Sequence, residues 1–260
     1  MTKLQLIVIA SCVALFGILY FALDTKPPSF KEIELSRSLE SSSLDIDQEV
    51  RKMMENLPEN AQVELGVLDA EFTETSSEKE KTEILKKISG FWYNQNRNDI
   101  AGYYAEQVAE NESTAEAWNI AGSTYSLGLQ QLDPGPYWEY CYDGAIKAFE
   151  NAISIDPDYL DSKINLALCY VERAPENNPM KGITMLLDLN KQYPKNVAVM
   201  NQLGKLAVQT NQLDRARERF EAVLRIEENN KIATCYLSQV YKGLGDIANA
   251  AKYQALCDKL

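Results

Sequence analysis

The pattern of apolar positions divides the chain into one unbroken hydrophobic run and a series of amphipathic segments. Residues 4–23 are 20 consecutive uncharged residues, and a Pro27-Pro28 pair follows soon after. At about 1.5 Å per helical residue, this run spans roughly the 30 Å hydrocarbon thickness of a bilayer. From Asp45 onwards, apolar residues recur every three to four positions, as in helices that bury one face. We therefore expect an all-α protein with a single transmembrane helix within residues 1–26.

Two other interpretations of the apolar run stay open. A cleaved signal peptide would need small residues at the cut, and Tyr20-Phe21-Ala22-Leu23 offers no good site. Ile9-Ala10-Ser11-Cys12 loosely resembles a lipobox, but the chain stays apolar well beyond Cys12. An uncleaved anchor therefore fits best. The side of the membrane stays open, because basic residues flank the run on both sides: Lys3 before it, and Lys26, Lys31 and Arg37 after it.

Residues 27–43 are polar and rich in serine, which predicts a linker. Residues 44–114 predict a helical N-terminal region. Its first helix covers 45–56, and a second, after Pro58, has an apolar face. That face is expected to consist of Val63, Leu65, Val67 and Leu68. Thr75 or Ser76 is expected to cap the helix that follows.

The stretch from 118 to 157 has the most regular pattern of large and small residues. Its large residues are Trp118, Tyr125 and Phe149, and its small ones Ala121, Gly122 and Ala145. Two antiparallel helices approach closely only where small residues lie at their crossing, and Pro157 ends the second helix. This order of residues resembles the tetratricopeptide repeat (TPR) signature. The resemblance implies an α-solenoid of stacked helix pairs.

The same spacing predicts four TPR units over 115–159, 160–196, 197–230 and 231–260. Their corresponding small residues are Ala145, Gly182, Ala216 and Ala250. Residues 82–114 form a degenerate pair that lacks the proline. It matches the signature at Leu85, Ile88, Trp92, Ala101 and Ala105. The plan resembles the membrane-anchored TPR proteins of bacteria, which implies a single-pass protein of the inner membrane.

The unit at 115–159 contains an insertion. Tyr125 and Ala145 are twenty residues apart instead of the usual nine, so eleven residues are added around 132–142. Pro136 suits a first helical position, so the second helix is expected to begin early. The insertion carries the aromatic residues Tyr137, Trp138, Tyr140 and Tyr142. These either pack onto the lengthened helix or form an exposed anchor for a partner.

The resemblance also implies a superhelix whose inner wall, formed by the first helices, binds an extended peptide or a partner helix. The candidate wall residues lie one turn from the packing positions: Asn119, Ser123, Asn165, Leu168, Asn201, Lys205, Gln239 and Lys242. Alternatively, they are solvated helix surface. TPR domains that bind a chaperone's carboxylate resemble one another in a Lys–Asn clamp, and Asn119 and Ser123 depart from it. A chaperone cofactor of that type is therefore not expected.

Composition narrows the function. The net charge of −12 disfavours nucleic-acid binding, and the absence of histidine removes the commonest general base and metal ligand. No phosphate loop or nucleophile motif occurs, so we expect no enzyme, no cofactor and no metal site. The five cysteines form no Cys-x-x-Cys motif, which favours buried free thiols over a disulfide framework and leaves the redox compartment open.

Together these patterns predict a membrane-anchored TPR scaffold or adaptor. It would bind a protein or peptide partner through its concave groove and possibly through the aromatic insertion. Two alternatives stay open. The chain could be a non-catalytic subunit that recruits substrate to a membrane enzyme complex, or a structural protein that self-associates.

Overall fold

The computed structural model describes residues 45–260, and all of the secondary structure in this range is helical. This confirms the all-α prediction for the described part of the chain. The predicted anchor at 1–26 and the linker at 27–43 lie outside the described residues. Between residues 45 and 260, no helix is long and apolar enough to cross a membrane. Residues Met54–Leu260 form one compact unit, and its N-terminal boundary falls within α3 (Ile46–Asn56).

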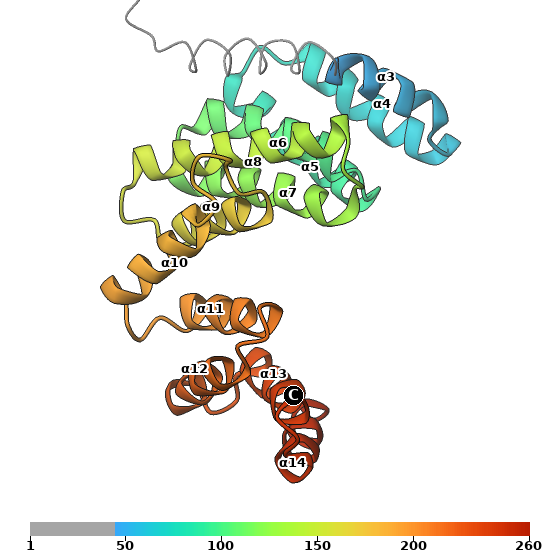
Figure 1. The fold of residues 1–260 in the computed structure, drawn as a ribbon. Helices are drawn as coiled ribbons and strands as arrows, with labels where there is room; N and C mark the ends of the chain where they lie inside the picture. Colours follow the sequence, from blue (N-terminus) through green and yellow to red (C-terminus); the bar gives the residue numbers. More distant parts are fainter. Residues whose placement is uncertain (1–44) are drawn as a thin grey trace, which may run out of the picture. The chain divides into compact units, whose positions relative to one another are not determined.

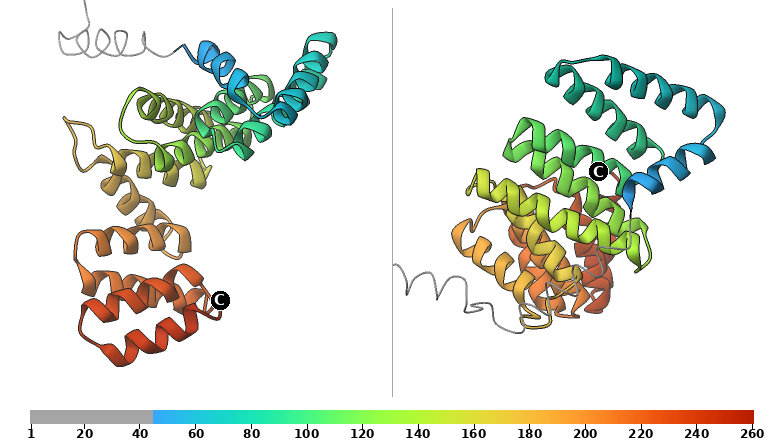
Figure 2. Two further views of the ribbon diagram at one scale, coloured as in Figure 1. Left: turned by 90° about the vertical axis from the view of Figure 1, so that its right-hand side faces the viewer. Right: turned by 90° about the horizontal axis from the view of Figure 1, so that it is seen from above.

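In the unit 54–260, α4 (Glu59–Glu74) is followed by five helix pairs, drawn in Figures 1 and 2. The pairs are α5 (Glu78–Asn94) with α6 (Asn98–Glu112), α7 (Ala115–Gln131) with α8 (Pro136–Ile155), α9 (Leu160–Glu172) with α10 (Lys181–Gln192), α11 (Val197–Gln209) with α12 (Leu213–Ile226), and α13 (Lys231–Gly243) with α14 (Ile247–Cys257). The two helices of each pair pack together, and the second helix of each pair packs against the first helix of the next. This is a solenoid of stacked hairpins.

Short polar side chains begin several of these helices. In each case the cap accepts a hydrogen bond from a backbone N–H three residues further on, which satisfies one of the free donors of the first turn. The capping residues are Ser77, Thr114, Asn196, Asn230 and Asp246. The cap of α5 is therefore Ser77, and not Thr75 or Ser76 as the sequence suggested.

Close contact between a glycine and an aromatic ring holds two of the pairs together. A Cβ atom added to Gly122 of α7 would lie 2.6 Å from the Phe149 ring of α8. A Cβ atom added to Gly204 of α11 would lie 2.7 Å from the Phe220 ring of α12. Both phenylalanines are fully buried. The second helix of each hairpin thus packs directly on the backbone of the first.

The first and last pairs share a different contact at the corresponding position. The Ser89 hydroxyl of α5 donates to the carbonyl of Ala101 in α6 at 2.9 Å. In α13 and α14, the Ser238 hydroxyl donates to the carbonyl of Ala250 at 3.0 Å. The separation along the chain is twelve residues in both. The degenerate pair α5–α6 is therefore built like the last pair, despite its missing proline.

The predicted apolar face of α4 is only partly correct. Leu65 is buried, but Val63 and Val67 are 63% and 53% exposed. Helix α4 packs on α5, so only a narrow face of it is covered. The valines lie beside that face.

The prediction of free thiols is wrong for one pair of cysteines. Cys235 of α13 and Cys257 of α14 form a disulfide, with their Cα atoms 4.9 Å apart. The hairpin brings together residues that are 22 positions apart, which no short cysteine motif could signal. In the chain-entropy model, a disulfide that closes a loop of this length adds about 3 kcal/mol to the free energy of unfolding. Cys141 and Cys169 are free and buried, and burial raises their thiol pKa values to about 12 and about 11.

The glycine contacts predict opposite effects of the same substitution at two sites. Gly122→Ala should lower the free energy of unfolding by about 1–3 kcal/mol, because the new methyl group overlaps the Phe149 ring. Gly66→Ala in α4 should raise the free energy of unfolding by up to about 1 kcal/mol, because alanine has the higher helix propensity. The added methyl group would have no other atom within 4 Å. Denaturant unfolding followed by circular dichroism measures both. Equal effects at the two sites would contradict the packing argument.

Candidate protein-binding cleft

The inserted residues lengthen both helices of the second pair. Helix α7 has 17 residues and α8 has 20, whereas each helix from α9 to α14 has between 11 and 14. Pro136 occupies the start of α8, as its fixed φ angle predicts. The insertion is therefore an extension of the hairpin.

This extension rests on the beginning of α6. The Asn98 side chain donates to the Gln131 side chain of α7 at 2.7 Å, and Gly128 allows the Cys141 sulfur of α8 to approach closely. Asn98 and its neighbour Asp99 are each only 3% exposed, and Arg97 forms an ion pair with Asp99 at 2.6 Å. The preceding pair thus supports the extension.

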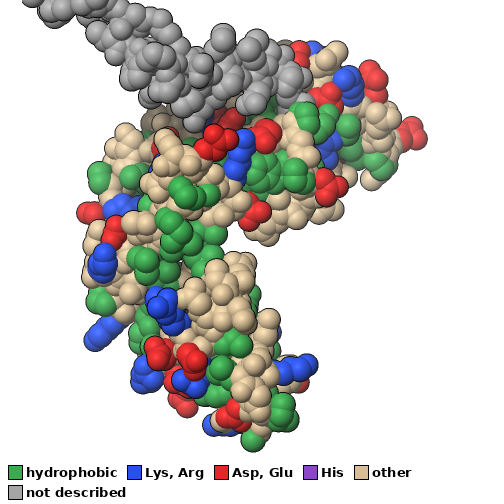
Figure 3. All heavy atoms as spheres, in the orientation of Figure 1, with side chains coloured by type: hydrophobic (Ala, Val, Ile, Leu, Met, Phe, Trp, Pro, Cys, Tyr) green, Lys and Arg blue, Asp and Glu red, His purple; other side chains and the backbone are tan. Residues whose placement is uncertain are grey.

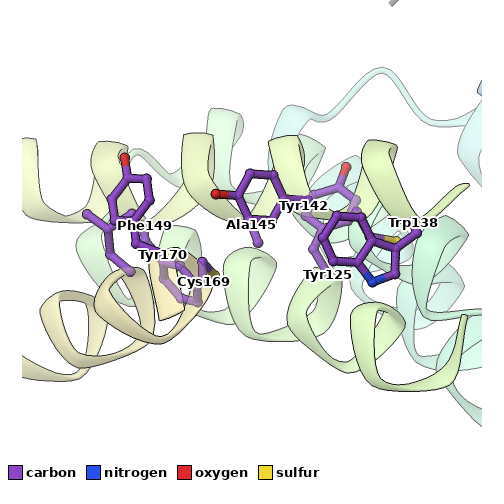
Figure 4. Packing of buried hydrophobic residues seen from close by; sticks show 9 residues of the cluster. Tyr125, Trp138, Tyr142, Ala145, Phe149, Cys169 and Tyr170 are labelled. Carbon is purple, nitrogen blue, oxygen red and sulfur yellow. The ribbon is translucent and has the colours of Figure 1, made fainter. Parts of the chain in front are cut away.

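The structure places the aromatic residues of the insertion largely in the core. Trp138 and Tyr142 are each 9% exposed, and their rings stack with centroids 5.4 Å apart. The Arg173 guanidinium, from the end of α9, lies over both rings and pairs with Glu139. Figure 4 shows Trp138, Tyr125 and Tyr142 towards one end of the cluster and Phe149 with Tyr170 towards the other. Tyr137 and Tyr140 are half-buried. This arrangement favours packing over an exposed anchor.

Tyr125 is the centre of this core. Its ring fits between Gly102 of α6 and Gly144 of α8, where added Cβ atoms would lie 2.4 Å and 2.7 Å from it. Its hydroxyl donates to Glu106 at 2.8 Å and lies 3.2 Å from the Tyr140 hydroxyl. Burial, with added effects of Tyr140 and Glu106, raises the pKa of Tyr125 well above its usual range. The phenol therefore stays neutral.

The eight predicted wall residues do not form one surface. Asn119 accepts a hydrogen bond from the buried Ser162 of α9 at 2.9 Å. Asn201 is 4% exposed and donates to Asn230, the cap of α13, at 3.3 Å. Both amides thus join one first helix to the start of the next. A role in binding is disfavoured for Asn201, because its side chain is buried.

The other wall residues have mixed surroundings. Leu168 packs against the core around α9 to α11, and Lys205 lies 6.0 Å from the Tyr236 ring centroid. Asn165 and Ser123 are half-buried, while Gln239 and Lys242 are exposed on α13. Among the described residues, no hydrogen bond or ion pair joins any two of the eight.

A cavity of about 550 Å³ opens instead between α5 and α7, over α6. Ala105, Val108 and Ala117 form its buried floor. Tyr93 of α5 and Ile120 of α7 flank it and are 51% and 54% exposed. We call this site the α5–α7 cleft; its lining also includes Lys86, Ser89, Gly90, Glu112, Thr114, Glu116 and Thr124.

The uncharged polar groups of the α5–α7 cleft are bonded within the protein. Ser89 and Thr124 donate to the backbone carbonyls of Ala101 and Ile120, and Thr114 caps α7. Hydrogen bonds to Glu112 and then Glu83 raise the pKa of Lys86, so that side chain stays charged. The cleft therefore offers apolar contacts beside carboxylates.

Tyr93 and Ile120 were not among the binding residues predicted from the sequence. Each is a large apolar side chain on a first helix at a position that the repeat signature does not need for packing. Gly90, in the middle of α5, is a second signal, since glycine weakens a helix interior. These exceptions to the repeat pattern point to Tyr93 and Ile120 as exposed apolar residues, but not to the cavity that they flank. Within residues 45–260, no group of three or more metal-binding side chains is placed to hold a metal ion.

The geometry defines a helical-repeat protein with an apolar cleft between two of its first helices. Residues 197–230, which cover α11 and α12, match the family model described as tetratricopeptide repeat. The structure is similar to TTC0263, a thermophilic TPR protein in Thermus thermophilus, with 18% identity and a TM-score of 0.51. The match covers 68% of this chain and 89% of that one. The family match thus identifies a tetratricopeptide repeat at 197–230, one of the four units that the residue pattern predicted, and the likeness to TTC0263 shows a shared fold.

Further structures match less closely. MamA residues 41-end from Desulfovibrio magneticus RS-1 are 14% identical, with a TM-score of 0.47 over 69% of this chain and 94% of that one. Another crystal structure of MamA protein is 18% identical, with a TM-score of 0.45 over 69% and 91% of the two chains. A comparison with curated proteins finds no match.

The burial of the insertion predicts a large loss of stability on truncation. Trp138→Ala should lower the free energy of unfolding by about 3–5 kcal/mol, because it removes the ring that stacks on Tyr142 and lies under Arg173. Ile155, in the same helix, is 47% exposed. Ile155→Ala should therefore change the free energy of unfolding by less than about 1 kcal/mol. Denaturant unfolding compares the two. A mild effect of Trp138→Ala would restore the exposed-anchor interpretation.

Proposed function

We propose that this protein is a non-catalytic, membrane-anchored scaffold that binds a protein partner through the α5–α7 cleft. The observation that carries the proposal is the pair of exposed side chains, Tyr93 and Ile120, on either side of a cavity with a buried apolar floor. Apolar side chains gathered at a concave surface are typical of interaction sites. Tyrosine is also among the residues that contribute most to interfaces.

The surroundings of the cleft support a preformed site. Its floor comes from α6 and α7, which pack tightly on each other, and the cap Thr114 fixes the start of α7. Helix α5 is held to α6 by the Ser89 hydrogen bond. A partner would therefore meet a largely rigid surface and would lose little binding free energy to ordering it.

The anchor and its orientation belong to the same proposal. The apolar run at 4–23 has the length of a membrane span. The disulfide between Cys235 and Cys257 supports an extracytoplasmic location for the repeats, because disulfides persist in oxidising compartments. We therefore place the scaffold on the outer side of the membrane that anchors it.

Site-specific photocrosslinking tests the cleft. The full chain, carrying a photoreactive phenylalanine analogue at Tyr93 or Ile120, is expressed in its native host and irradiated. We expect discrete adducts to a partner at both positions. Ile226, which is 45% exposed at the end of α12, is the matched control and should give none of them. Identical adducts at all three positions, or none at the cleft, would contradict the proposal, and adducts to a second copy would indicate self-association.

Thiol trapping in intact cells tests the orientation. Cells are quenched in acid and denatured, and free thiols receive a maleimide mass tag with or without prior reduction. Reduction should add two tags per chain, because Cys235 and Cys257 are bonded to each other. In the Cys235→Ser variant, reduction should add none. Full tagging of the unaltered chain before reduction would place the repeats in a reducing compartment.

A further inference from the structure

The charge of the described chain is divided very unevenly. Residues 45–159 contain 23 Asp and Glu against eight Lys and Arg, a formal net charge of −15. Residues 160–260 contain 11 acidic and 14 basic residues, a net charge of +3. In Figure 3, acidic side chains are spread over the helices from α4 to α8, while Lys and Arg are more frequent over the later helices. The α5–α7 cleft lies entirely in the acidic part.

The charges at the cleft itself have the same sign. Its single basic side chain, Lys86, is ion-paired with Glu112 at 2.6 Å and with Glu83 at 2.9 Å. Glu116, on the opposite side of the cavity, has no ion pair within the described part of the chain. Glu83 and Glu112 together therefore more than neutralise the positive charge of Lys86.

A second hollow, of about 520 Å³, lies on the other side of Gly90 and continues the pattern. Val67 of α4 and Phe91 of α5 line it, together with Glu64 and Lys87. Lys87 lies 3.7 Å from Glu71, so it too is close to a carboxylate. Gly90 borders both hollows and has no atom within 4 Å of the position of a Cβ atom. Val67, Tyr93 and Ile120 thus belong to an apolar track bordered by carboxylates.

We propose that the partner segment that binds here is basic and apolar, with Lys or Arg residues flanking the side chains that enter the α5–α7 cleft. This inference rests on the proposed function and specifies the chemistry of the partner. Apolar side chains would fill the cavity beside Tyr93 and Ile120. The flanking cations would lie near Glu112 and Glu116, where an excess of negative charge attracts them and raises the association rate.

The same charges disfavour an acidic peptide or a second copy of the chain as the ligand of the α5–α7 cleft. An acidic peptide would be repelled by Glu112 and Glu116 at the cleft and by the net charge of −14 on residues 54–159, which belong to the same unit as the cleft. A second copy of the chain offers only the weakly basic residues 160–260, at +3, as a complementary surface. A separate basic segment is therefore the occupant that the charge distribution favours.

Peptide display on the purified full chain tests the inference. A library of random peptides of about 12 residues is panned against the unaltered chain, and peptides that also bind the Ile120→Asp variant are subtracted. We expect the remaining peptides to combine apolar residues with a net positive charge. A synthetic representative should bind about fivefold or more weakly to Glu116→Lys. Glu218→Lys, at an exposed glutamate of α12 outside the cleft, is the matched control and should have little effect.

The outcomes separate the two proposals. Cleft-dependent peptides that are neutral or acidic, or whose affinity does not change from about 50 to 500 mM salt, would overturn the basic partner but leave the cleft as a binding site. A library in which no peptide distinguishes the unaltered chain from Ile120→Asp would overturn both. If a second copy competes with the selected peptide for the cleft at comparable concentration, the separate partner is wrong and self-association takes its place.

Discussion

The close approach of aromatic rings to glycine backbone is the contact on which the packing of the α7–α8 hairpin and of its neighbour α6 depends. Tyr125 fits between Gly102 and Gly144 and so joins three helices, while Phe149 lies on Gly122 within the same hairpin. A repeat array has no central core, so each hairpin must be held by its own contacts and by those to its neighbours. Tyr125 of α7 makes both kinds of contact. Its ring packs on α8 of its own hairpin, and its ring and hydroxyl contact Gly102 and Glu106 of α6 in the neighbouring hairpin. A methyl group at any of these glycines would push neighbouring helices apart.

The two sides of α7 have different roles. On one flank, Asn119 bonds Ser162 and joins α7 to α9. On the other, Ile120 and Thr124 border a cavity that separates α7 from α5. The lengthened α7–α8 hairpin supports this arrangement, since it rests on the start of α6 and is covered by Arg173. The insertion therefore stabilises the α6–α8 packing, and α6 and α7 in turn supply the floor of the cleft.

The two ends of the array differ in chemistry. The acidic first part carries the cleft, and a separate charged partner can be drawn to it over a distance set by salt screening. In the pair α13–α14, the disulfide between Cys235 and Cys257 joins the two helices covalently. This bond limits the separation of α13 and α14 when the hairpin opens.

The helical repeats could be predicted from the order of residues alone. Gly122 with Phe149 and Gly204 with Phe220 occupy corresponding places in two helix pairs, and the first pair is separated by eleven more residues because of the insertion. The eleven extra residues and Pro136 also indicated the lengthened hairpin. The cleft, the disulfide and the burial of Asn201 could not be predicted in this way, because they depend on which residues of different hairpins face each other. That is set by the rotation and separation of neighbouring helices. The spacing of residues within one helix specifies neither, so these features emerge only when the hairpins pack together.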